Sequence, residues 1–161
     1  MVTSLRSKTE RFGRFDEEVI MRWEKIFKSF LALFLLFGFL GCASKERQAE
    51  KHFKQGFEYQ DQGNLDKAIE EYKKTTELNP NHWQAHMNLG VVYLEQKKYD
   101  QAIEEFNTVV KLNYYYGSAH YNLGYVYILK GEKEKAQGEL KILKMMGSGL
   151  ADRLEKRMGK E

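Results

Sequence analysis

The chain contains very little proline and very little cysteine, one residue of each in 161. The single cysteine, Cys42, excludes any disulfide within the chain, and the single proline, Pro80, leaves most of the sequence free to form long helices. Excess charge is also missing, since 26 basic and 23 acidic residues give a net charge of +3 with no basic block. We therefore expect no nucleic acid among the partners.

The one pronounced apolar run is too short for a membrane-spanning helix. Residues 30–40 read FLALFLLFGFL, eleven residues without a polar side chain, whereas a spanning helix needs about 20. Arg22, Lys25 and Lys28 precede the run. A short apolar run with a positive flank is typical of a secretory signal, so we predict a signal peptide over residues 21–41.

The four residues that end at Cys42, Phe-Leu-Gly-Cys, resemble the lipobox of bacterial lipoproteins, with Phe39 in place of the more usual leucine. The resemblance implies a lipid on Cys42, which becomes the first residue of the mature chain, and a tether over residues 42–48. Two or more acyl chains would give durable membrane anchoring. An uncleaved anchor and ordinary cleavage after Ala43 are the alternatives. In a Gram-negative organism, residues 43–44 (Ala-Ser) lack the Asp-type retention signal, which favours the outer membrane facing the periplasm.

Residues 1–20 do not fit a signal peptide, because four acidic residues lie ahead of the apolar run: Glu10, Asp16, Glu17 and Glu18. Met21 begins a better signal. The codons for residues 17–21 could contain a purine-rich ribosome-binding sequence followed by a start codon. We therefore predict that residues 1–20 are an upstream extension and that translation begins at Met21, with a genuine disordered extension as the alternative.

A pattern of small and large residues occurs three times at a spacing of 34 residues. In each copy a glycine precedes a tyrosine by three positions, and an alanine precedes a large residue by four. The framework residues are Gly56, Tyr59, Ala68, Tyr72, Gly90, Tyr93, Ala102, Phe106, Gly124, Tyr127, Ala136 and Leu140. A fixed period of this length indicates stacked copies of one supersecondary unit.

Each copy reads as two helices joined by a short turn. The units span residues 49–82, 83–116 and 117–147, and in the second we expect helices over 83–96 and 99–112. Gly63 and Gly131 lie in the turns of the first and third units, where glycine is a good helix stop. Residues 97–98 (Lys-Lys) replace the glycine in the second unit.

Residues 148–161 read as a capping helix. After a Gly-Ser-Gly break, Leu150, Leu154 and Met158 fall on one helical face and charged residues on the other. Such a helix is suited to cover the open apolar edge of the last unit while facing water.

The repeated pattern resembles the tetratricopeptide repeat, and the resemblance covers nearly all of the predicted mature chain. It implies an all-α fold, a right-handed α-solenoid of three helix-turn-helix repeats plus a C-terminal capping helix. It also implies that the first helices line a concave groove for an apolar or amphipathic segment of a partner protein. The groove residues expected from the family's positions are Phe53, Phe57, Met87, Val91, Leu94, Tyr121, Tyr125 and Ile128.

Some members of this family bind a C-terminal carboxylate through lysine and asparagine side chains. Asn88 and Asn122 match the asparagine positions of that clamp, but Phe53 and Phe57 stand where the first unit would need lysine and asparagine. We therefore do not expect the clamp in this chain.

Residues that often carry chemistry follow the repeat here. Histidine occurs at the same phase in every unit, and His82 and His86 are spaced as zinc ligands on one helix face can be, but no third ligand is close. The glutamate pairs at 70–71 and 104–105 also recur, and we expect them on a solvated, salt-bridged surface. We therefore expect no catalytic residue, no metal and no cofactor.

Three consecutive tyrosines, Tyr114, Tyr115 and Tyr116, lie in the loop between the second and third units. They are candidates for anchoring an interface. Alternatively, they pack between the second and third repeats, since Tyr114 stands where the first unit has Pro80.

The sequence as a whole predicts a membrane-anchored scaffold or assembly factor in the bacterial cell envelope. The groove favours a separate protein partner, since exposed apolar and aromatic side chains usually mark such a site. The alternative is a self-assembling structural lipoprotein, whose groove would be used in homo-oligomerisation or would pack on its own tether.

Overall fold

The computed structural model describes residues 21–30 and 44–159, and within these residues the chain forms helices and no strand. Residues 21–30 are helical and belong to a separate compact unit from residues 45–161. Among the described residues, none of the helices combines the length and the apolar character that crossing a membrane requires.

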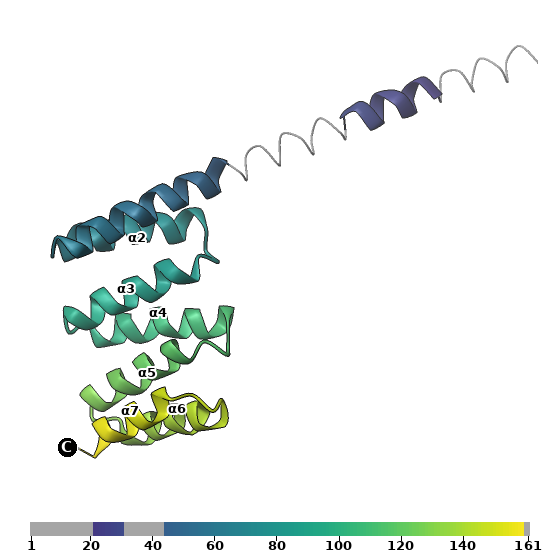
Figure 1. The fold of residues 1–161 in the computed structure, drawn as a ribbon. Coiled ribbons are helices and arrows are strands. Elements are labelled where there is room, and N and C mark those ends of the chain that lie inside the picture. The colour runs from purple at the N-terminus through teal and green to yellow at the C-terminus, as the bar shows by residue number, and fades with distance from the viewer. Residues whose placement is uncertain (1–20, 31–43, 160–161) are drawn as a thin grey trace, which may run out of the picture. The chain divides into compact units, whose positions relative to one another are not determined.

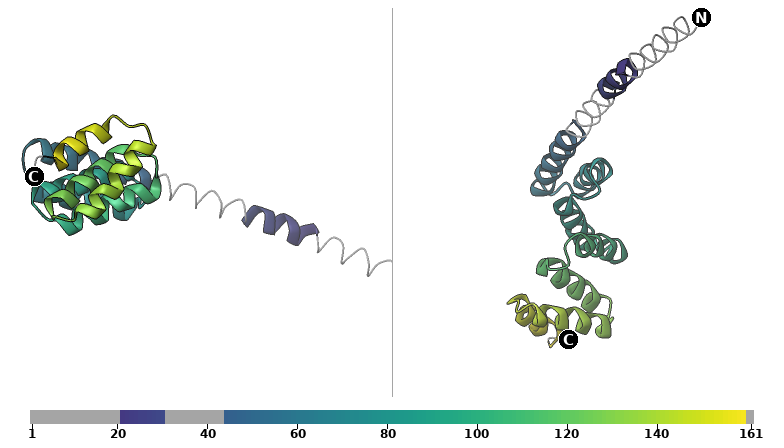
Figure 2. Two further views of the ribbon diagram at one scale, coloured as in Figure 1. Left: turned by 90° about the horizontal axis from the view of Figure 1, so that it is seen from below. Right: turned by 90° about the vertical axis from the view of Figure 1, so that its right-hand side faces the viewer.

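The larger unit is a stack of paired helices (Figures 1 and 2). Its first helix covers residues 44–61, followed by α2 (Leu65–Leu78), α3 (Trp83–Glu95), α4 (Tyr99–Leu112), α5 (Gly117–Leu129), α6 (Lys133–Met145) and α7 (Leu150–Met158). Contacts between α2 and α3 and between α4 and α5 join consecutive pairs. The prediction of an all-α solenoid of three repeats with a C-terminal capping helix is confirmed.

The turns within the repeats share one backbone conformation. Gly63 and Gly131 have φ values of +73° and +72°, in the left-handed region that glycine adopts without strain. Lys97 takes the same place in the second repeat with φ of 59°, although this region costs a side chain-bearing residue about 1–2 kcal/mol. The next residue in every turn donates its N–H to the carbonyl of the framework tyrosine, at 2.8 Å in all three. The repeat geometry therefore holds a lysine where the sequence offers no glycine.

The second helix of each repeat buries residues spaced by four and then three positions, which lie on one helical face. In α4 these are Ala102, Phe106 and Val109, all fully buried. The other repeats bury the residues at the same positions: Ala68, Tyr72 and Thr75, then Ala136, Leu140 and Leu143. Most of these buried residues contribute to two core clusters, one that runs from α2 to α5 and one formed by α5, α6 and α7.

The framework glycines let the two helices of a repeat approach closely. A Cβ built on Gly90 would lie 2.6 Å from Cε1 of Phe106, and one built on Gly56 would lie 2.7 Å from the ring of Tyr72. The aromatic ring therefore packs directly on the helix backbone. This contact offsets the cost of about 1 kcal/mol that glycine carries within a helix.

The helix α7 covers the end of the stack, where it packs against both α5 and α6 (Figure 1). Leu154 is fully buried, and a Cβ built on Gly124 would lie 2.5 Å from its Cδ2. In the third repeat, the smaller Leu140 stands at the framework position of Phe106. In the first two repeats the framework glycine is therefore covered by an aromatic ring of its own repeat. In the third repeat, Gly124 is covered by Leu154 of α7 instead.

Candidate functional site

The residues expected to line the groove belong to the first helix of each repeat. We call them the first-helix face: Phe53, Phe57, Met87, Val91, Leu94, Tyr121 and Tyr125. Ile128 was expected among them, but only 6% of its surface is exposed and it belongs to the core formed with Leu140 and Leu154. That expectation was wrong, because α6 and α7 both contribute side chains to the core that encloses Ile128.

The exposure of this face varies along the stack. Phe57 is the most open of these side chains, with 59% of its surface exposed. Phe53 is half-buried, with ring centroids 5.9 Å from Tyr72 and 4.7 Å from His82. Met87, Val91 and Leu94 are partly buried against the core cluster that runs from α2 to α5. The face therefore presents apolar side chains that are partly exposed to solvent and are held in place by packing against the core.

A polar link lies among these apolar residues. The hydroxyl of Tyr72 donates to Oε1 of Gln60 at 2.8 Å and accepts a hydrogen bond from Nδ2 of Asn88 at 3.2 Å. Burial raises the pKa of Tyr72, although the hydrogen bond from Asn88 opposes the shift. The hydroxyl thus joins the first two repeats while it stays protonated.

The third repeat brings its part of the face into contact with the cap. Nε of Arg157 donates to the hydroxyl of Tyr121 at 2.9 Å, and its guanidinium carbon lies 4.2 Å from the ring centroid of Tyr125. Arg153 lies 5.2 Å from the ring centroid of Tyr121. A pocket of about 360 Å³ is lined by Tyr121, Arg153, Lys156 and Arg157. This pocket was not predicted from the sequence, although the three basic residues of the capping helix were a signal for it.

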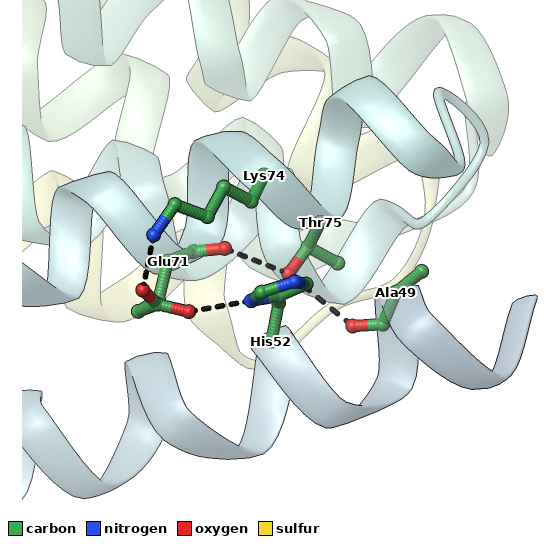
Figure 3. A network of polar contacts seen from close by, with 5 residues as sticks. All are labelled: Ala49, His52, Glu71, Lys74 and Thr75. Carbon is green, nitrogen blue, oxygen red and sulfur yellow. Dashed lines mark hydrogen bonds and ion pairs between the residues drawn. The ribbon is translucent and has the colours of Figure 1, made fainter. Parts of the chain in front are cut away.

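Each repeat contains the same contact between a histidine and a glutamate, and Figure 3 shows the first of them. The Nδ1–Oε2 distances are 2.6 Å for His52 and Glu71, 2.6 Å for His86 and Glu105, and 2.7 Å for His120 and Glu139. Every pair joins the first helix of a repeat to the second. In the first repeat, Nζ of Lys74 also binds Glu71, at 2.6 Å (Figure 3).

The second ring nitrogen of two histidines contacts the loop before the repeat. Nε2 of His86 lies 3.1 Å from the carbonyl oxygen of Pro80, and Nε2 of His120 lies 2.8 Å from that of Tyr114. A carboxylate and a carbonyl only accept hydrogen bonds, so the ring of His86 satisfies both of its partners as the imidazolium. Partial burial lowers the pKa of His86, but the hydrogen bonds and charge of its partners outweigh burial, and the net shift is upward.

The glutamate pairs are not wholly solvated. Glu70 and Glu104 are exposed, as expected, but Glu71 is only 9% exposed and the carboxylate side chain of Glu105 is 19% exposed. The expectation was wrong for the second glutamate of each pair, because that position faces the first helix of its repeat. Burial raises the pKa of Glu71, yet hydrogen bonds from Lys74 and His52 lower it below its ordinary value.

Among the described residues, no group of three or more His, Cys, Asp or Glu side chains is placed to hold a metal ion. His82 and His86 instead have separate partners, since Nδ1 of His82 accepts from the N–H of Ala85 at 3.2 Å and caps α3. Cys42, the predicted lipidation site, lies outside the described residues.

The three loop tyrosines have different surroundings. The ring of Tyr116 lies 4.8 Å from that of Trp83, and the ring of Tyr114 lies 5.3 Å from that of His120. Tyr115 is 81% exposed. Tyr116 therefore packs on α3, whereas Tyr114 keeps 49% of its surface exposed beside His120 and Tyr115 has most of its surface open to solvent.

Comparisons with known proteins agree with this geometry. The tetratricopeptide repeat family matches residues 53–113 and 98–140. No curated protein has a significantly similar sequence. The chain is similar to the solved first TPR of Spaghetti (RPAP3) bound to the HSP90 peptide SRMEEVD, with 22% identity and a TM-score of 0.65 over 71% of this chain and 93% of that one. It is similar to the TPR domain of Arabidopsis OM64, with 18% identity and a TM-score of 0.65 over 72% and 98% of the two chains. It is also similar to MamA, with 28% identity and a TM-score of 0.59 over 70% and 75%.

Proposed function

Because the chain belongs to the tetratricopeptide repeat family, we propose that it is a non-catalytic scaffold that binds an apolar or amphipathic segment of a partner protein on its first-helix face. The observation that carries the proposal is the exposed phenyl ring of Phe57 beside half-buried apolar side chains on the same face. Such side chains gain from further burial when a partner covers them. A solved relative with a similar fold holds an HSP90 peptide, so the fold is able to hold a peptide.

The test is the double variant Phe57→Glu and Met87→Glu. Two carboxylates on this face would be desolvated by an apolar partner, so we expect partner recovery to fall at least about ten-fold, the equivalent of about 1.4 kcal/mol. Recovery is measured by cross-linking in cells and quantitative mass spectrometry of the captured proteins. Circular dichroism checks that the helices are retained.

The matched control is Tyr115→Glu, which adds a carboxylate at an exposed position in the loop between α4 and α5. It should leave recovery unchanged. Unaltered recovery in the double variant would remove the first-helix face from consideration, and loss in the control alone would assign binding to the loop. If sedimentation shows an oligomer that only the double variant dissociates, the face serves self-assembly.

We further propose that Cys42 carries a lipid that anchors this scaffold in the bacterial cell envelope, at the outer membrane in a Gram-negative organism. The support is the short apolar run with a basic flank that ends in the sequence Phe-Leu-Gly-Cys. Cys42→Ser should move the protein from the membrane fraction to the soluble fraction, because acyl chains supply the anchoring energy. Persistent membrane association or palmitate labelling of the variant would refute the site.

A further inference from the structure

We propose that the pocket between α5 and α7 binds the carboxylates of an acidic segment of the partner protein. This inference rests on the proposed function and names the chemistry of the partner at one end of the first-helix face. The pocket has a volume of about 360 Å³ and is lined by one tyrosine and three basic side chains.

The basic side chains of the pocket have no carboxylate partner within the described part of the chain. Among the described residues, the hydrogen bond and ring contacts of Arg153 and Arg157 are with tyrosines, and neither of them nor Lys156 forms an ion pair. The glutamate nearest to them in sequence, Glu155, instead binds Nζ of Lys144 on α6 at 2.7 Å. The positive charge of the pocket is therefore available for an anion from outside the chain.

The guanidinium of Arg157 is already held in place. It donates one hydrogen bond, through Nε, to the hydroxyl of Tyr121 and lies over the ring of Tyr125. A guanidinium has five N–H donors in a planar fork that matches a carboxylate, so donors are left for a ligand. Holding the side chain before binding lowers the entropy that binding would otherwise cost.

The position of the pocket favours a protein segment over other anions. Tyr121 and Tyr125 belong to the first-helix face and also contact the arginines of α7. A segment with apolar side chains followed by carboxylates would therefore contact both regions at once. The nearly balanced net charge of +3 offers no extended basic surface for nucleic acid.

The experiment uses the full-length chain in a non-ionic detergent and two fluorescein-labelled dodecapeptides. One peptide has leucines in its first half and three consecutive glutamates near its end, and the other has glutamines in their place. Fluorescence anisotropy at low salt should give a Kd at least about ten-fold lower for the glutamate peptide. The double variant Arg153→Gln and Arg157→Gln should remove that preference.

A matched control, Lys133→Gln and Lys141→Gln, removes two exposed charges from α6 and should keep the preference. Equal affinity for both peptides, or binding of neither, would overturn the inference. If Phe57→Glu with Met87→Glu raises the Kd of both peptides equally while the pocket variant leaves both Kd values unchanged, the proposed function stands and the inference fails. If the pocket variant weakens only the binding of vesicles with 30% phosphatidylglycerol, the anion is a lipid headgroup and the inference is also overturned.

Discussion

Replacing Phe106 with alanine is expected to lower the free energy of unfolding by about 3–5 kcal/mol, the usual cost of deleting a buried aromatic side chain. The ring is fully buried and packs on the backbone at Gly90. Folded domains have a total stability of about 5–15 kcal/mol, so this one change would remove a large part of it. Urea unfolding followed by circular dichroism measures the loss.

The contact with Gly90 provides a sharper version of the same test. Gly90→Ala would place a Cβ 2.6 Å from Phe106, and such overpacking costs about 1–3 kcal/mol. Combined with Phe106→Leu, which reproduces the leucine of the third repeat, the alanine should cost less than it does alone. Gly138→Ala is the control, since its Cβ would meet nothing within 4 Å and should stabilise α6 by up to about 1 kcal/mol. Additive costs for the two changes in the second repeat would show that the helices do not meet there.

Removing the carboxylate of Glu139 is the second large change. Glu139→Ala is expected to destabilise the fold by about 3 kcal/mol, because it leaves the ring of His120, which is 1% exposed, without its partner. Glu71→Ala should cost less, since the side chain of His52 is 28% exposed and water reaches it. Thermal and urea unfolding of the two variants compare the costs.

The exposed Glu104 provides the control for this series, since Glu104→Ala should change stability by no more than about 0.5 kcal/mol. A double-mutant cycle of His120→Ala with Glu139→Ala isolates the energy of the contact itself. A coupling energy near zero would mean that the bridge follows from the repeat geometry without stabilising it.

Much of the fold was predictable from the chain. The 34-residue period, the glycine and alanine positions and the phase of the buried residues follow from local helical periodicity. The second unit illustrates this, since helices were expected over 83–96 and 99–112, and the observed helices end at Glu95 and Leu112. The prediction of the lipid on Cys42 concerns residues that the structure does not describe and stays a prediction.

The candidate site was less predictable. Phe57 is exposed, and Met87 and Val91 are partly buried, but Ile128 is enclosed by the core. Family positions specify which helix face a residue occupies, whereas its exposure depends on what covers that face. In the third repeat the cover is α7, whose Leu154 and Arg157 contact α5 in an arrangement that the repeat itself does not contain.

The sequence by itself determined the number of repeats, through the 34-residue period, and the positions of the helices and of the framework residues, because these follow from spacings along the chain. Only the tertiary structure decided that Glu71 and Glu105 face histidines and that a basic pocket forms beside Tyr121. The physical reason is that such pairs join residues 19 or more positions apart. Their distances are set by how two helices cross, and helical periodicity within one segment carries no record of that crossing.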